Sequence, residues 1–564
     1  MSWILGAHGL HSPDHASSLR KIASLPLFEY HDAGMSILAG GIPETCAFGK
    51  TDGGAWTVCG LGIERAPDGF RLLDTRDWHE RLEQEGNLQK LEGQFAGIHY
   101  RNGELTLFTD RIGSRDLYFT SLPGVTLFST RLDWLARLSR KDELDLHEFG
   151  GRWLFFYQLS TGSIIKNIIR LGPGAEIKIS PKGTSISRVG WNPGPASLDF
   201  ASTLEQITTF PFQSNHRVTL GLSGGLDSRL LFSLLLQANG AWDVHTFGPP
   251  EHPDAIIAKQ IAKAFGIPHR HLYIEPLDDP DLGTKVEDFC AQSLALRPAS
   301  SILQLQHYPM LREDRTIVID GSFGEVARRQ MLNRIAIMGR RALLERDMEK
   351  IFSRLARFRA DFFTEETNMK LRSGAMAQVE ALWSEMPDPR SFGIGNWLDL
   401  LVVRAGLPNV NAAEQARIDH YVPGFTPFVQ PSFLNAAFRL PIRDRRGGKA
   451  FRALIHRTNP RLESFPRVVI DCTVPYSFST LFAFAWREMK LRLGKTYRDR
   501  TNERFLLQMR PMIEDLSHSE SVRTYPLYDQ RKVRAIVDGY FAGNLTLGPQ
   551  LNWWLGFELW RSAL

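Results

Sequence analysis

Apolar runs alternate with amphipathic stretches between Val218 and Ile319. Four short runs are typical of buried strands, namely Val218–Leu222, Val244–Gly248, His271–Ile274 and Thr316–Ile319. Helices are predicted over Arg229–Leu236 and over Asp254–Phe265, where Gly266-Ile267-Pro268 ends the second one. Strands and helices that alternate at this spacing predict a parallel sheet, with ligands bound at the carboxyl ends of the strands.

The first 190 residues follow a different pattern. Strand-like alternation is interrupted there by glycine-rich turns, for example near Gly93, Gly113 and Gly172, which predicts a strand-rich region. A Pro/Gly-rich link covers residues 192–197. A chain of 564 residues is long enough for two domains with proper cores. We therefore expect an α/β protein with domains over residues 1–195 and 196–564.

Six residues join the first predicted strand to its helix: Ser223-Gly224-Gly225-Leu226-Asp227-Ser228. The glycines let the backbone approach an anion, and the helix start supplies N–H donors and a favourable dipole. A tight turn with a serine N-cap explains some of these residues, but not Asp227 or the second serine. A carboxylate beside a phosphate is repulsive unless a metal lies between them, so the loop predicts ATP with Mg²⁺. The predicted cleavage yields AMP and pyrophosphate.

A second turn with glycines and carboxylates follows the fourth predicted strand: Asp320-Gly321-Ser322-Phe323-Gly324-Glu325. One such turn is ordinary between elements. Two in one sheet, each with an acid, predict a shared metal site, and we assign Asp227 and Glu325 to it as metal ligands and catalytic residues.

These segments resemble the synthetase domain of the asparagine synthetase family, which includes class B asparagine synthetases, β-lactam synthetases and lasso peptide cyclases. The resemblance rests on the SGGxDS loop, on Phe247 with Pro253-Asp254, and on the turn from Asp320 to Glu325. It implies an ATP pyrophosphatase fold of the adenine nucleotide alpha hydrolase type. It also implies that Ser223, Gly224, Gly225 and Ser228 hold the pyrophosphate, and that the adenine and ribose pocket is lined by Leu222, Phe247 and Gly321.

The N-terminal part resembles the glutaminase-like domain of the same family, which implies an αββα sandwich of the N-terminal-nucleophile type. Members that use glutamine expose an N-terminal cysteine as nucleophile. Here Ser2 holds that position, and the cysteines lie elsewhere, at Cys46, Cys59, Cys290 and Cys472. Because an alcohol is much less ionised than a thiol, we expect that the amine comes from the acceptor substrate and not from glutamine.

Two departures from the family pattern affect the chemistry. Ser322 stands where asparagine synthetases have a glutamate, and Glu325 stands at an aspartate position. A late lysine of the family is also missing, and Arg467 is the nearest cation that can stabilise the developing charge. Arg467 could instead be an ordinary surface arginine. Lys449 is the other candidate cation, although it is expected to begin a helix.

Three further segments carry expectations. An arginine-rich insertion from Val326 to Leu400 predicts either solvated basic helices or a lid over a peptide. The aromatic residues from Phe478 to Leu493 are expected to pack in a core. The C-terminal segment Leu551–Trp560 is expected to form a closing helix.

Composition limits the class of protein. The formal net charge of +5 is too small to indicate nucleic-acid binding. Cysteines without paired spacing indicate a reducing compartment. The start of the chain lacks the features of a signal peptide, and no apolar stretch reaches the roughly 20 residues of a membrane span. We therefore expect a cytoplasmic protein.

The resemblance favours a lasso peptide cyclase, that is, a macrolactam synthetase. Such an enzyme adenylates an Asp or Glu side chain of a precursor peptide and closes a ring with the peptide's N-terminal amine. It implies ATP and Mg²⁺ as cofactors, and a leader peptidase and a leader-binding protein as partners. The alternatives are a β-lactam or asparagine synthetase acting on a small amino acid, and an inactive scaffold that binds a partner protein.

Overall fold

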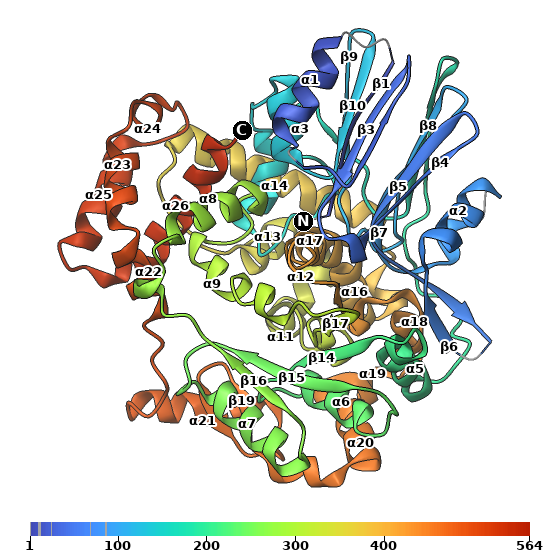
Figure 1. Ribbon diagram of the computed structural model, residues 1–564. Coiled ribbons are helices and arrows are strands. Elements are labelled where there is room, and N and C mark those ends of the chain that lie inside the picture. The colour runs from blue at the N-terminus through green and yellow to red at the C-terminus, as the bar shows by residue number, and fades with distance from the viewer. Residues whose placement is uncertain (1, 10–12, 24, 68, 85–86) are drawn as a thin grey trace.

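The computed structural model describes residues 2–9, 13–23, 25–67, 69–84 and 87–564 (Figure 1). An antiparallel sandwich, blue to cyan in the figure, lies beside a parallel sheet and a large set of helices. This arrangement confirms the predicted α/β class, with a strand-rich N-terminal sandwich followed by a parallel sheet. Within the described residues, no helix has the length and apolar character that crossing a bilayer requires.

Two antiparallel sheets form the sandwich. The first has the order β11 (Ile169–Arg170), β9 (Tyr118–Leu122), β10 (Val125–Ser129), β1 (Trp3–Gly9), β3 (Met35–Gly40), β2 (Phe28–His31). The second has the order β13 (Gly183–Arg188), β12 (Ala175–Ser180), β8 (Glu104–Thr109), β7 (Glu92–Arg101), β5 (Gly54–Ala66), β4 (Cys46–Thr51), and β6 (Gly69–Leu72) also pairs with β5.

Apolar side chains fill the space between these sheets because alternate residues of each strand point inward. Ile37, Ile98 and Phe128 are fully buried in this core. Helices α1 (Pro13–Ile22) and α3 (Leu132–Ser139) cover the first sheet, and α2 (Thr75–Glu83) packs on the second (Figure 1). The layers are therefore αββα, as expected.

The parallel sheet has the order β16 (His269–Leu272), β15 (Trp242–Phe247), β14 (Arg217–Gly221), β17 (Thr316–Ile319), β18 (Gly424–Phe425). All four neighbouring pairs are parallel. Helices α5 (Phe200–Gln213), α6 (Asp227–Leu235) and α7 (Pro253–Phe265) pack against it. The four strands predicted from the apolar runs are present, each within two residues of its expected bounds.

The insertion between Val326 and Leu400 is helical and is built into the body of the protein. Its main helices are α11 (Asn333–Met338), α12 (Arg340–Glu345), α13 (Met348–Leu355), α14 (Glu365–Glu385) and α16 (Ile394–Leu401). Helix α14 lies directly on α4 (Leu146–Leu154), where a Cβ on Gly150 would lie 2.2 Å from the carbonyl oxygen of Leu371. This packing supports neither freely solvated helices nor a detached lid.

A set of α-helices follows α21 (Thr480–Arg492): α22 (Thr501–Gln508), α23 (Arg510–His518), α24 (Glu520–Thr524), α25 (Gln530–Phe541) and α26 (Gly548–Ser562). Helix α26 is a closing helix, as expected, but its aromatic side reaches the N-terminal part of the chain. Phe557 lies 5.5 Å from Phe149 and 5.9 Å from Trp153, measured between ring centroids. The N-terminal and C-terminal parts therefore share one apolar core.

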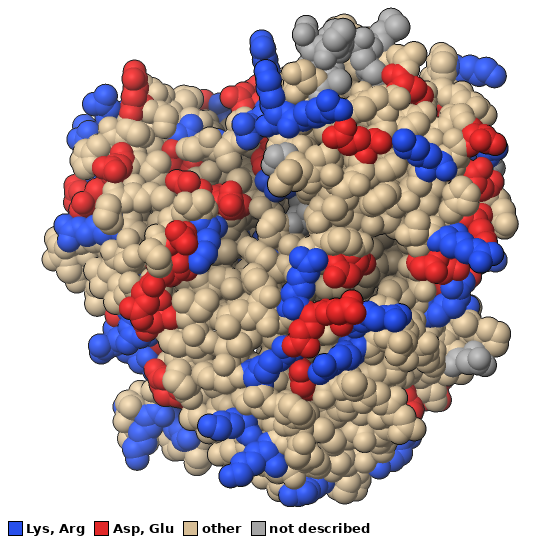
Figure 2. Space-filling view, viewed as in Figure 1, with Lys and Arg blue, Asp and Glu red and all other residues tan. Residues whose placement is uncertain are grey.

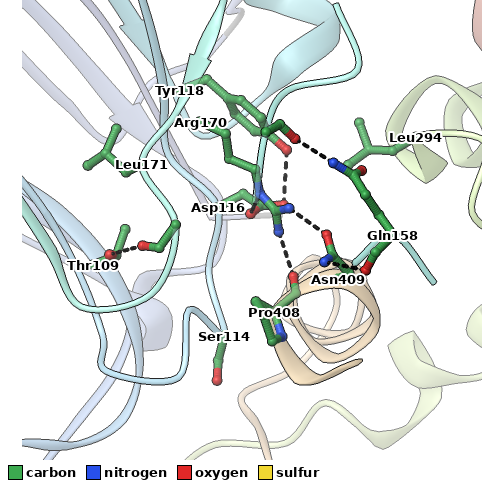
Figure 3. A network of polar contacts seen from close by, with 12 residues as sticks. Thr109, Ser114, Asp116, Tyr118, Gln158, Arg170, Leu171, Leu294, Pro408 and Asn409 are labelled. Carbon is green, nitrogen blue, oxygen red and sulfur yellow. Dashed lines mark hydrogen bonds and ion pairs between the residues drawn. The ribbon is translucent and has the colours of Figure 1, made fainter. Parts of the chain in front are cut away.

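A polar network also crosses this junction (Figure 3). Arg170 Nε donates to Asp116 at 2.6 Å, and Arg170 Nη1 donates to the side-chain oxygen of Asn409 at 2.6 Å. Asn409 belongs to a π-helix, Val402–Asn411, and its amide nitrogen donates to the carbonyl oxygen of Gln158 at 2.8 Å. Because hydrogen bonds are directional, the network fixes the sandwich against this helix.

The expectation of core packing for the segment from Phe478 to Leu493 is wrong. Helix α21 (Thr480–Arg492) leaves Phe482 68% exposed, and Phe484 and Leu493 are exposed as well. The apolar spacing was correct for a helix, but the neighbouring hairpin of β19 (Arg467–Val469) and β20 (Cys472–Val474) is too small to cover it.

Candidate functional site

The two acidic turns lie side by side at one end of the parallel sheet. Strands β14 and β17 are direct neighbours, with Leu220 opposite Ile319. The loop after β14 and the turn after β17 therefore leave the sheet at the same edge. This is the edge where ligands bind in open parallel sheets.

Hydrogen bonds give the SGGLDS loop a fixed shape. Ser223 Oγ and Ser228 Oγ are 2.9 Å apart, and the amide of Gly225 donates to Ser223 Oγ at 3.1 Å. The amide of Gly224 donates to Asp254 Oδ1 at 2.7 Å. The two serine hydroxyls are thus held next to each other, and Gly224 connects the loop to α7.

Asp227 and Glu325 both lie against the guanidinium of Arg328. Arg328 Nη2 is 2.6 Å from Asp227 Oδ2 and 3.5 Å from Glu325 Oε1. Asp227 is 9% exposed, and within the described chain its Oδ1 has no hydrogen-bond partner. Burial raises the pKa of Asp227 to about 7, and the charge of Arg328 opposes this effect.

A large cavity opens over these turns, with a volume of about 900 Å³. Its walls include most of the residues predicted from the sequence, namely Leu222, Ser223, Gly225, Asp227, Ser228, Phe247, Gly321, Glu325 and Arg467. Gly224 is the one predicted residue that does not line it. No set of three or more His, Cys, Asp or Glu side chains in the described residues is placed to hold a metal ion.

Arg467 is buried at the cavity wall and is not a surface arginine. Its position depends on Arg229, which donates to the carbonyl oxygens of Phe465 at 2.8 Å and of Pro466 at 2.7 Å. Burial lowers the pKa of Arg467 to about 10, with contributions from nearby arginines. Lys449, the other candidate cation, is exposed at the first position of α20 (Lys449–Thr458) and does not line the cavity.

Sequence reasoning missed Arg229 and Arg328. Arg229 directly follows the SGGLDS loop, and Arg328 comes one helical turn after Glu325. Buried charges need partners. Arg328 could have been found by asking which cation balances the two acids, and Arg229 by asking which group holds the segment before Arg467.

Part of the cavity wall is aromatic. The ring of Phe247 stacks on that of His307, with centroids 5.3 Å apart and planes 20° apart, and it meets Tyr308 edge-on at 5.0 Å. Aromatic side chains of this kind can pack against a planar base. His245 lies within β15 and is buried, and burial lowers its pKa to about 3.

Ser2 is buried away from this cavity. Its hydroxyl contacts Thr45 Oγ1 and lies 3.5 Å from the carbonyl oxygen of Ile42. The side chain is 0% exposed. In this position the hydroxyl is held by its neighbours and is closed to solvent.

Comparisons with known proteins bear on the second half of the chain. Residues 199–458 match the asparagine synthase family. A search of the curated proteins found no match. Among solved structures, the chain is similar to a glutamine phosphoribosylpyrophosphate amidotransferase from B. subtilis complexed with ADP and GMP, with 13% identity, 58% of this chain and 77% of that chain covered, and a TM-score of 0.22.

A second structure, described as the allosteric regulatory enzyme of purine biosynthesis, has 14% identity, covers 60% of this chain and 78% of its own, and has a TM-score of 0.21. Neither TM-score supports an argument about this chain. The family match does, since it spans the parallel sheet and both acidic turns. It supports the asparagine synthetase family for residues 199–458, and that family indicates an ATP-dependent, amide-bond-forming ligase.

Proposed function

We propose that the protein is an AMP-forming macrolactam synthetase of lasso peptide biosynthesis. It would join an Asp or Glu side chain of a precursor peptide to the peptide's own N-terminal amine. The observation that carries the proposal is the meeting of the SGGLDS loop, Asp227, Glu325 and a buried cation, Arg467, in one cavity. The volume of this cavity lies near the upper end of the roughly 300–1,000 Å³ of small-molecule sites. A cavity of this size supports the binding of a nucleotide together with a second substrate.

The acidic pair fits Mg²⁺. This ion is usually held by one or two carboxylates together with substrate phosphates. Asp227 Oδ1 is buried without a partner among the described residues, and Glu325 approaches the same guanidinium as Asp227. Asp227 and Glu325 would hold the ion, which would neutralise phosphate charge there.

The chain's own groups would bind and orient both substrates. Ser223, Gly225 and Ser228 would donate hydrogen bonds to the pyrophosphate portion, and Phe247 would contact the adenine. As a peptide carboxylate oxygen bonds to the α-phosphorus, the α–β phosphoanhydride bond breaks and pyrophosphate leaves. Arg467 would offset the charge that develops on it, which is often the largest catalytic contribution.

The second half-reaction would form the amide. The N-terminal amine bonds to the activated carbonyl carbon, AMP departs, and the amine loses its proton. Holding both ends of one peptide in one cavity supplies the effective molarity that ring closure needs. Ser2 is buried and hydrogen-bonded, which supports an amine supplied by the substrate. A leader peptidase and a leader-binding protein would prepare the precursor.

The test is AMP release, with hydroxylamine trapping of the activated carboxylate. We expect AMP with a candidate precursor peptide and not with free aspartate. Asp227→Asn should abolish AMP release with the fold retained by circular dichroism, while Asp314→Asn, at an exposed position outside the cavity, should not. Trapping with aspartate alone would indicate a small-substrate synthetase. Absence of AMP with every carboxylate would indicate a scaffold.

A further inference from the structure

A second pocket lies behind the wall of the large cavity. It encloses about 160 Å³ and is lined by Phe156, Leu296, Arg297, Arg357, Phe358, Arg359, Val410 and Trp553. These residues come from the segment after α4, the segment after α8 (Leu282–Ser293), the link between α13 and α14, the π-helix and α26. None of them lines the large cavity.

The pocket holds an excess of positive charge. Arg359 is 7% exposed, and its Nη2 donates to the carbonyl oxygens of Phe155 at 3.0 Å and Phe156 at 3.4 Å. Throughout the described residues, Arg359 forms no ion pair, and its Nη1 has no hydrogen-bond partner. Burial, together with the charges of Arg152 and Arg297, lowers the pKa of Arg359 to about 9.

Within the described chain, one carboxylate forms an ion pair with an arginine of this pocket. Glu414 pairs with Arg297, so Arg357 and Arg359 are left without an acidic partner among the residues that the structure describes. A buried charge is costly unless it is paired. An anion that entered the pocket would therefore gain a charge-assisted contact without displacing an acidic side chain from Arg359.

Aromatic rings give the pocket its second property. The guanidinium of Arg359 lies 4.3 Å from the ring centroid of Trp553. Phe156 is 50% exposed and Phe358 is 75% exposed. A guanidinium on a tryptophan ring beside exposed rings offers a ligand both a cation and apolar surface.

The two cavities share one segment of wall. Leu296 and Arg297 line the small pocket, and Pro298, Ser300 and Ser301 line the large one. A group held in the small pocket is thus separated from the nucleotide site by one stretch of backbone.

We propose that the small pocket binds a free carboxylate carried on an aromatic or aliphatic residue. The arginines would hold the carboxylate, and Phe156, Phe358 and Trp553 would cover the apolar part. If the proposed function is right, on which this last step rests, the ligand is a residue of the peptide substrate remote from the reacting ends. The pocket would then help to hold the peptide while its ring closes.

Binding of N-acetyl-L-phenylalanine to the full-length protein, without nucleotide, tests the pocket. We expect saturable binding by calorimetry, which N-acetyl-L-phenylalaninamide and inorganic phosphate do not reproduce. Arg357→Gln removes an exposed arginine of the pocket, so the fold should be kept, and affinity should fall about tenfold, as for loss of one charged hydrogen bond. Arg340→Gln, at an exposed position of α12 outside the pocket, is the matched control.

Three results would overturn the proposal: equal binding of the amide, binding of phosphate alone, or unchanged affinity in Arg357→Gln. ATP binding measured on the same variant separates this proposal from the proposed function. Arg357→Gln should bind ATP as the unaltered protein does, because Arg357 does not line the large cavity. Failure of ATP binding in the unaltered protein would count against the proposed function and would leave the carboxylate result intact.

Discussion

At the scale of single residues, the site is governed by charges that burial makes expensive. Asp227 and Glu325 share Arg328, and Arg467 lies among Arg229, Arg328 and Arg452. Arg328 thus neighbours both the acidic pair and Arg467, so acids and excess cations lie close together at the cavity. Such an arrangement suits a ligand that carries several negative charges together with a divalent cation.

His245 should make stability depend on pH. The folded protein keeps its imidazole neutral because burial lowers the pKa to about 3. The unfolded chain takes up a proton below about pH 6.5, so stability falls as the pH drops from 6.5 towards 3. Between pH 7 and pH 5 the loss from this residue should be about 2 kcal/mol.

Urea unfolding at the two pH values measures this loss. His245→Gln should be less sensitive to the change than the unaltered protein, and His456→Gln, whose ring is largely exposed, should not differ from it. If all three proteins lost the same unfolding free energy between pH 7 and pH 5, His245 would not contribute to the pH dependence.

Local sequence patterns located the residues of the two turns, but not the distant residues that contact them. The loop chemistry placed Ser223, Asp227 and Glu325 at one cavity. The pairing of Asp227 with Arg328 joins residues 101 apart in sequence, and no local pattern encodes it. Arg359 lies in the same arginine-rich insertion, and only tertiary packing reveals that it is buried.

At the scale of elements, α10 (Gly324–Ala327) determines how closely the two acidic turns approach. A Cβ on Gly324 would lie 2.4 Å from Asp227 Cγ. Gly324→Ala should therefore displace the Asp227 carboxylate. A shift of about 1 Å at a reacting centre can cost on the order of 100-fold in rate, and we expect a loss of this size in AMP release.

Gly283→Ala is the matched control for this substitution. Gly283 lies inside α8, and a Cβ there meets only the flexible end of Met512, at 3.3 Å. This variant should keep full AMP release and near-native stability. If Gly324→Ala were as active as Gly283→Ala, the close approach of the two turns would not matter for catalysis.

Elements could be predicted more reliably than their surroundings. Periodicity located β14, β15 and β17 because buried strands are continuous apolar runs. It also indicated a helix near Phe482, but periodicity states only that a helix has an apolar side. Whether that side is covered depends on what packs on it, and the hairpin beside α21 leaves Phe482 exposed.

At the scale of the whole molecule, a buried ion pair joins the sandwich to the parallel sheet. Arg115 Nη2 lies 2.8 Å from Asp419 Oδ2, and the side chains are 3% and 0% exposed. Asp419→Asn would leave the Arg115 charge buried without a counter-charge, which costs about 3–5 kcal/mol. We expect a lower midpoint of urea unfolding, followed by tryptophan fluorescence.

The double variant Arg115→Met with Asp419→Asn should recover most of this loss, because it removes both charges. The side chain introduced at position 419 can still accept the hydrogen bond that the backbone amide of Gly424 donates at 3.2 Å to Asp419 in the native protein. Equal midpoints for the single and double variants would show that the ion pair does not hold the two parts together.

Acidic and basic side chains are interspersed on the face shown in Figure 2, so that face carries no broad patch of one charge. The domain boundary at residue 195 remains a prediction from the sequence. In the structure, Phe149 and Phe557 pack in one core, and apolar periodicity in either segment could not show that the other segment covers it.

The hairpin of β19 and β20 with α21 has a small apolar cluster of its own, and it supplies Val469, Ala483 and Phe484 to the wall of the large cavity. The facing walls rest on the sheet and on the shared aromatic core. Strand β19 is tied to the SGGLDS loop, since the amide of Val468 donates to the carbonyl oxygen of Gly224 at 3.0 Å, whereas α21 leaves Phe482 exposed. A bulky guest should therefore be admitted by an outward shift of α21, with β19 held in place.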